Sequence, residues 1–222
     1  MRATAGKVVG LLYILIVLVA WPAAGQAPPA PDPQKPAAKS PQEEYKALLE
    51  RVKASDKSVD FGKMRQLQTQ LESYDPYGDI ESDPFEPLRS GNFKEAKVVA
   101  GQMIEANYLD VKAHIAAAAA AEKLGDKDAA THHQYVVKGI IDSIFKSGDG
   151  RTTETAFKVI TVDEEYALLQ SQGLRVAGQS LVNDEKHSYD VLNALDPISM
   201  VTQEVYFNID PIMQAADKMF SP

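Results

Sequence analysis

The chain has 222 residues, of which 45% are hydrophobic and 24% charged, and it carries a formal net charge of −8 at pH 7 with no cysteine. This acidity disfavours nucleic acid and anionic membrane surfaces as partners, because both attract basic stripes of Lys and Arg. The lack of cysteine excludes disulfide scaffolds, thiolate zinc sites, cysteine nucleophiles and lipidation of an N-terminal cysteine.

Residues 1–25 have the pattern of a secretory signal peptide. Arg2 and Lys7 precede an apolar run over residues 8–20, and small residues follow Pro22. This order predicts cleavage near Gly25 or Ala27, and therefore a protein that is secreted or periplasmic. The alternative is an uncleaved N-terminal membrane anchor, since the apolar stretch over residues 8–24 is at the lower limit of the length that spans a bilayer.

Prolines crowd residues 26–41, at positions 28, 29, 31, 33, 36 and 41. This density favours an extended, polyproline-like linker and disfavours helix or sheet. A docking peptide for a proline-reading partner is the alternative to a simple spacer.

Residues 42–147 carry the apolar spacing of helices. Ser40 and Pro41 are suited to the N-cap and first position of a helix that runs to about residue 53. The spacing predicts further helices over residues 60–71, 93–106, 111–124 and 126–145. Pro84 and Pro87 restrict any helix within residues 80–88 to a short or kinked one.

Two short stretches in this half repeat each other. Gly91-Asn92-Phe93-Lys94-Glu95-Ala96 is echoed by Gly125-Asp126-Lys127-Asp128-Ala129-Ala130, at a spacing of 125 − 91 = 34 residues. That is the period of the tetratricopeptide repeat, a pair of antiparallel helices. Since only about one and a half units are present, we expect the flanking segments to cap them.

Residues 155–222 have the composition of a small sheet. Strands are predicted over residues 156–161, 174–182, 188–195 and 202–208, a short helix capped by Asp163 over residues 164–172, and a final helix from Asp210. Short polar links between successive strands favour an antiparallel meander. The sequence thus predicts an α+β fold in one domain over residues 42–222, with tetratricopeptide-like antiparallel helical hairpins followed by a small antiparallel β-sheet.

Residues 59–210 resemble a family of secreted bacterial proteins known only as a domain of unknown function. The motifs that carry the resemblance are Ala113-His114, Lys123-Leu124-Gly125-Asp126, His133, Gly139, Asp142-Ser143-Ile144, Ser147-Gly148-Asp149-Gly150, Glu164-Glu165-Tyr166 and Val205-Tyr206-Phe207-Asn208. The resemblance implies an envelope location and a tetratricopeptide-like helical half. It implies no activity and no catalytic residues.

Six polar residues are candidates for a binding site: His114, His133, Asp142, Asp149, Glu165 and Tyr166. Imidazole is the usual proton shuttle and metal ligand, but neither histidine has a second ligand at helical spacing, so no metal site and no cofactor are predicted. Asp149 lies in a Gly-rich turn that resembles a calcium loop without its alternating oxygen ligands. Glu165 follows Glu164 at the start of a helix, where the helix dipole by itself favours acids.

Three functions fit this pattern, and no catalytic motif decides among them. The first is a secreted or periplasmic binding or scaffold protein that holds a peptide or partner protein. The alternative is an envelope hydrolase or metal-dependent enzyme with a His, Asp and Glu site at the junction of the helical and β halves, near residues 147–150. The third is a structural component of the envelope. No strong membrane interaction is expected once the signal is removed.

Overall fold

In the computed structural model, residues 39–78 and 83–220 are described. They belong to one compact unit that begins at Lys39. The predicted signal peptide and nearly all of the proline-rich linker lie outside the described residues. Within the described part, no helix has both the length and the apolar character needed to cross a bilayer.

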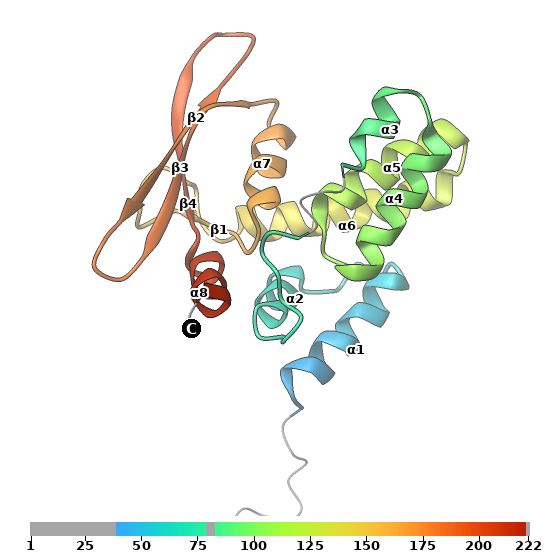
Figure 1. Cartoon of the computed structure of the whole chain (residues 1–222), viewed down its shortest axis with the longest axis horizontal. Helices are drawn as coiled ribbons and strands as arrows, with labels where there is room; N and C mark the ends of the chain where they lie inside the picture. The colour runs from blue at the N-terminus through green and yellow to red at the C-terminus, as the bar shows by residue number, and fades with distance from the viewer. Residues whose placement is uncertain (1–38, 79–82, 221–222) are drawn as a thin grey trace, which may run out of the picture. The chain divides into compact units, whose positions relative to one another are not determined.

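The described residues form eight helices and four strands, which confirms the predicted α+β class (Figure 1). The helices are α1 (Pro41–Lys53), α2 (Phe61–Gln68), α3 (Phe85–Arg89), α4 (Phe93–Ala106), α5 (Val111–Leu124), α6 (Lys127–Phe145), α7 (Val162–Ser171) and α8 (Asp210–Phe220). The strands are β1 (Phe157–Lys158), β2 (Arg175–Asn183), β3 (Ser188–Leu195) and β4 (Thr202–Asn208).

The helices begin and end where side chains satisfy the free backbone groups. Ser40 and Glu43 form a reciprocal capping box at the start of α1. Gly91 and Gly125 both have a φ of 79°, a left-handed conformation that favours glycine at the end of a helix. Asn92 and Asp126 then cap α4 and α6. The 34-residue echo is therefore a repeated helix end followed by a repeated cap.

Helices α4, α5 and α6 pack against one another in sequence, and α3 lies against α4 and α5. Small side chains allow α4 and α5 to approach closely, with Ala100, Ala116 and Ala117 in a shared cluster. The first helical hairpin is truncated, because α3 has only five residues. The expected restriction by prolines in this segment is thus observed.

The sheet has the strand order β1-β4-β3-β2. The three long strands form the expected antiparallel meander, with Asp190 opposite Leu181 on β2 and Phe207 on β4. The fourth strand corrects the prediction of a purely antiparallel sheet, because β1 pairs with β4 in parallel. A long connection through α7, β2 and β3 separates β1 from β4 and allows the chain to return in the same direction.

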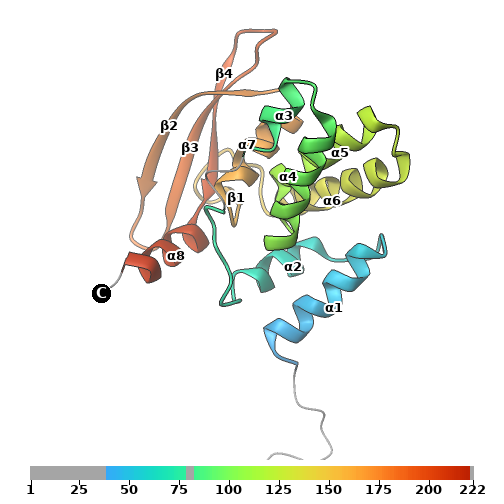
Figure 2. The ribbon, with the colours of Figure 1, turned by 45° about the vertical axis from the view of Figure 1, so that its right-hand side comes forward.

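Helix α7 lies between the sheet and the helical half in both views (Figures 1 and 2). It contacts α5 and α6 on one side and β2 on the other. It begins at Val162 after Thr161, so Asp163 lies within the first turn and is not the cap that the sequence predicted. A continuous hydrophobic core joins the two halves, from Met64 and Ile140 in the helices to Leu168 in α7 and Leu192 and Phe207 in the sheet.

Helix α2 is shorter than predicted. It ends at Gln68, and the amides of Gln70 and Leu71 then bond to the carbonyls of Leu67 and Gln68. These three-residue spacings tighten the chain into a turn instead of continuing the α-helix. The turn places Gln68 at the exit of α2, where it faces the junction between α4 and α5.

Candidate functional site

The six residues predicted from the sequence lie in four separate places. His114 and His133 meet between α5 and α6, whereas Glu165 and Tyr166 both face the Gln179–Asp190 pair of the sheet from α7. Asp142 lies on an exposed part of α6, and Asp149 lies in the turn after it. The structure therefore brings the six together only as two separate pairs, His114 with His133 and Glu165 with Tyr166.

The histidine pair is buried and internally hydrogen bonded. His114 is 0% exposed, and its Nε2 lies 2.9 Å from the Tyr108 carbonyl oxygen. Because a carbonyl only accepts, Nε2 carries the hydrogen and Nδ1 accepts from the Nδ1–H of His133, at 2.9 Å. Burial lowers the pKa of His114 to about 3, so this ring stays neutral. The two rings therefore meet directly across α5 and α6.

The neighbouring His132 is held in the same way. Its Nδ1 lies 2.8 Å from Ser55 Oγ and its Nε2 lies 2.9 Å from the Tyr108 hydroxyl. Burial lowers the pKa of His132 and of His133. Within residues 39–78 and 83–220, no three His, Asp or Glu side chains come together in a way that would hold a metal ion. The histidines form a packing network that fixes α5 and α6 to the turn after α1.

Glu164, which the helix dipole alone was expected to explain, forms a buried ion pair. Arg65 Nε donates to its Oε1 at 2.7 Å and Arg65 Nη2 donates to its Oε2 at 2.5 Å. Glu164 Oε2 also accepts from the Ile160 amide at 2.8 Å. Arg65 further bonds the Lys158 carbonyl. This bidentate pair ties α2 to α7 and to the segment that contains β1.

Glu165 faces the sheet and is 0% exposed, and neither of its carboxyl oxygens accepts a hydrogen bond from a described donor. The Asp190 carboxylate of β3, 7% exposed, lies against it and accepts from Gln179 Nε2 at 2.5 Å. Burial, reinforced by the charge of Asp190, raises the pKa of Glu165 to about 9. Burial raises the pKa of Asp190 as well. A single proton held on Glu165 allows this carboxyl group to donate a hydrogen bond to Asp190, whereas two ionised carboxylates would have no hydrogen to share.

The remaining candidates have structural partners at the surface. Tyr166 is 42% exposed, and its hydroxyl approaches Gln179 Oε1 at 3.4 Å. Asp142 pairs with Lys138 on the same helix at 2.5 Å. Asp149 Oδ1 accepts from Thr155 Oγ1 at 2.6 Å, and this hydrogen bond is the main cause that lowers the pKa of Asp149.

The turn over residues 147–150 is a tight structural corner. The amides of Asp149 and Gly150 both donate to the Thr155 carbonyl, at 2.9 and 2.8 Å. A Cβ atom on Gly148 would lie 2.3 Å from that carbonyl oxygen, and Gly150 has a φ of 68°. Close backbone approach explains Gly148, and the left-handed φ together with the nearby Phe157 ring explains Gly150. Oxygen atoms of the turn accept from neighbouring strands, since the Tyr206 amide donates to the Gly150 carbonyl and the Lys158 amide donates to Ser147 Oγ.

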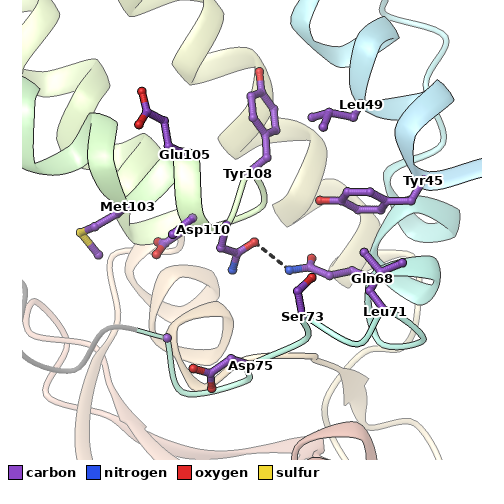
Figure 3. A pocket seen from close by; sticks show the side chains of 13 residues that line it. Tyr45, Leu49, Gln68, Leu71, Ser73, Asp75, Met103, Glu105, Tyr108 and Asp110 are labelled. Carbon is purple, nitrogen blue, oxygen red and sulfur yellow. Dashed lines mark hydrogen bonds between the residues drawn. The ribbon is translucent and has the colours of Figure 1, made fainter. Parts of the chain in front are cut away.

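A cleft that the sequence did not indicate lies between the α1–α2 pair and the junction of α4 with α5 (Figure 3). Its volume is about 480 Å³. We name it the Gln68 cleft. Its lining residues are Tyr45, Leu49, Gln68, Leu71, Ser73, Asp75, Gly78, Met103, Glu105, Ala106, Asn107, Tyr108 and Asp110.

Gln68 has an acceptor atom without a donor. The side chain is 6% exposed, and its Nε2 donates to Asn107 Oδ1 at 2.7 Å. The same Asn107 oxygen accepts from the Leu109 amide at 3.1 Å, which fixes the Asn107 amide and, in turn, the Gln68 amide. Gln68 Oε1 is therefore a buried acceptor with no hydrogen-bond partner. Such an atom carries a free-energy cost that a bound donor would relieve.

One sequence signal points to this residue. The apolar stripe of α2 runs through Phe61, Met64 and Leu67, so Gln68 and Arg65 lie at or beside inward-facing positions. A polar residue at such a position requires a buried partner. Arg65 has its partner in Glu164, whereas Gln68 is satisfied at only one of its two polar atoms.

Comparison with known proteins gives one family. A family model described as a domain of unknown function (DUF4919) matches residues 37–218. No curated protein and no solved structure matches the chain.

Proposed function

We propose that this chain, which belongs to the family described as a domain of unknown function (DUF4919), is a secreted or periplasmic binding and scaffold protein that holds a peptide or partner protein in the Gln68 cleft. The observation that carries the proposal is the unpaired acceptor Gln68 Oε1 in the cleft wall. Ligand sites combine apolar walls with a few fixed polar groups that orient the ligand. Leu49, Leu71 and Met103 supply the apolar walls of this cleft.

The helical half provides the frame for the cleft. Two helix ends with the same left-handed glycine, 34 residues apart, support a tetratricopeptide-like arrangement of α3 to α6. In such an arrangement, we expect the binding surface between the hairpins and the helices that flank them. Helices α1 and α2, which pack against each other, form that side, and α2 also contacts α6.

A photo-crosslinking residue in the cleft tests the proposal. p-Benzoylphenylalanine replaces Ser73, which lines the cleft, and in a matched control it replaces the exposed Val98 of α4. We expect a defined partner to be crosslinked from envelope extract only through position 73. The purified partner should bind the intact mature protein saturably and lose affinity for the Gln68→Leu variant. Equal crosslinking from both positions, or affinity that Gln68→Leu leaves unchanged, would contradict the proposal.

The location outside the cytoplasm is part of the same proposal. It rests on the basic, apolar and small-residue order of residues 1–25. The intact mass of the protein recovered from a bacterial envelope fraction measures cleavage directly. A mass that corresponds to the whole chain would favour an N-terminal anchor.

A second candidate function is that of an envelope hydrolase, and the Glu165–Asp190 pair is the observation that favours it. Two carboxyl groups that share one proton provide an acid and a base in one place. Chromogenic ester, glycoside and peptide substrates, tested with the parent protein and with Glu165→Gln, would detect such chemistry. Turnover by the parent that Glu165→Gln abolishes supports the hydrolase, and turnover that persists in Glu165→Gln removes it.

A further inference from the structure

We infer that the Gln68 cleft selects a basic side chain, so that the peptide or partner protein is anchored by an arginine or a lysine; this inference rests on the proposed function. It follows from the balance of charges and hydrogen-bonding groups in the cleft. Among the lining residues, Asp75, Glu105 and Asp110 are acids, and none is Lys, Arg or His. The cleft thus presents negative charge together with an acceptor that has no donor.

The acceptor defines what the ligand must supply. Gln68 Oε1 is fixed by the hydrogen bonds through Asn107 and has no hydrogen to donate. A ligand group that satisfies it must therefore carry an N–H or O–H. A carboxylate ligand has only acceptors at neutral pH, and the three acids would repel a carboxylate or a phosphate alike.

The acids select a charged donor over a neutral one. Asp110 is half-buried and caps α5 through its Oδ1, which accepts from the Ala113 amide at 2.8 Å. Burial raises the pKa of Asp110, and the charge of Asp163 adds to this effect. A cation in the cleft would favour the ionised form of Asp110 and so bind more tightly than a neutral group of the same shape.

The walls fit an aliphatic stem that ends in a cationic head. Tyr45 and Tyr108 lie on the same side of the cleft as Leu49, and Gln68 and Leu71 lie beside Tyr45 (Figure 3). Burial raises the pKa of both tyrosines to about 12, so their hydroxyls remain neutral. Lysine and arginine place a stem of methylene groups against apolar surface and extend the charge beyond it. The aromatic face of Tyr45 adds attraction for the charge, whereas Lys53 Nζ already lies 5.8 Å from the centroid of the Tyr108 ring.

Amino-acid amides test the selectivity on the intact mature protein. Nα-acetyl-arginine amide is compared with its neutral isostere Nα-acetyl-citrulline amide, and Nα-acetyl-lysine amide with Nα-acetyl-norleucine amide, by isothermal titration and by amide chemical shifts. We expect at least one charged probe to bind saturably and about tenfold more tightly than its neutral isostere, because a hydrogen bond to a charged group is the stronger kind. If each charged probe binds no more tightly than its own neutral isostere, the inference is overturned.

Variants locate the effect in the cleft. Gln68→Leu should weaken binding of the charged probe about tenfold through loss of the acceptor. The double variant Asp75→Asn and Glu105→Gln removes two exposed charges and should also weaken it severalfold. Its control, Glu154→Gln and Glu185→Gln, makes the same change in net charge at exposed positions outside the cleft and should have no effect. Equal loss in both double variants would assign the binding to the net charge and not to the cleft.

The outcomes of the two proposals are separable. Suppose that a partner crosslinks through position 73, but arginine and lysine amides displace it no better than their neutral isosteres. That result would support the binding function and overturn the selectivity for a basic side chain. Charged probes that bind the cleft, in the absence of any crosslinked partner, would support the selectivity and overturn the proposed function.

Discussion

Replacement of Glu165 by glutamine should make the protein more stable at neutral pH. Glu165 is fully buried and holds a proton against Asp190. Glutamine keeps the shape of the side chain, and its amide N–H donates to the Asp190 carboxylate without taking up a proton. The variant therefore keeps the hydrogen bond and loses the dependence of that bond on pH.

The magnitude follows from the difference between the folded and unfolded pKa. The pKa of Glu165 is about 9 in the folded protein, against an ordinary value of 4.5. Between these values the folded state binds the extra proton, so the free energy of unfolding falls as the pH rises through this window. From pH 4.5 to pH 7 this amounts to about 3 kcal/mol, from 2.5 pH units at about 1.4 kcal/mol each. Below pH 4.5 this loss of free energy of unfolding is absent.

Urea denaturation of the mature protein at pH 4.5, 6, 7 and 8 measures the effect. Far-UV circular dichroism is the suitable probe, because the single tryptophan, Trp21, falls in the predicted signal peptide. The advantage of Glu165→Gln over the parent should grow by about 3 kcal/mol between pH 4.5 and pH 7. Glu185→Gln, at an exposed position, should show no such growth. A difference that stays constant over this range would refute the assignment of the proton to Glu165.

Three further changes test the packing by the same denaturation assay. In Gly139→Ala the new Cβ would lie 2.3 Å from an aromatic ring of α2, and this overlap should destabilise the protein by about 1–3 kcal/mol. In Gly101→Ala the new Cβ would meet no atom within 4 Å, so the variant should stabilise α4 by about 0.5–1 kcal/mol. The pKa of His114 is about 3 in the folded protein, against an ordinary value of 6.5. The free energy of unfolding should therefore fall as the pH drops below 6.5, by about 2 kcal/mol at pH 5. The variant His114→Asn should lack this decline. Arg65→Met leaves the Glu164 carboxylate buried without its partner and should cost about 3–5 kcal/mol, part of which Glu164→Gln in the same chain should recover. The packing at Gly139 would be contradicted by equal stability of the two glycine variants. The burial of His114 would be contradicted by a stability profile against pH that runs parallel for His114→Asn and the parent. The buried ion pair would be contradicted if Arg65→Met left the free energy of unfolding unchanged.

Local signals in the sequence were sufficient for most elements of the fold. Apolar spacing and caps located α4, α5 and α6 to within a residue or two, and strand-type composition with short polar links located β2, β3 and β4. These signals act within one turn of helix or one strand, so no distant contact was needed to interpret them. The predicted boundaries were shifted at the exit of α2, where three-residue backbone bonds tighten the chain, and at the start of α7, which begins after Thr161.

The pairing of distant polar groups was not predictable from local patterns. Glu164 and Glu165 occupy the first turn of α7, where acids are common for reasons of the helix dipole alone. Their burial arises because α7 lies between the helical half and the sheet, so that both faces of its first turn are covered. Arg65 is 99 residues away from Glu164 along the chain, and no periodicity connects the two positions.

Saturation of hydrogen bonds distinguishes the junction of the two halves from the Gln68 cleft. At the junction, the turn over residues 147–150 bonds to Thr155, Glu164 bonds to Arg65, and one proton completes the Glu165 pair. Groups that satisfy one another in this way stabilise the contact between the halves and leave little free energy for a ligand. Gln68 Oε1 differs because its orientation is fixed while its bond is unmade, so a donor that reaches it restores a full hydrogen bond at no cost of reorganisation. For this reason we propose the cleft as the binding site and assign the polar contacts of the junction to stability.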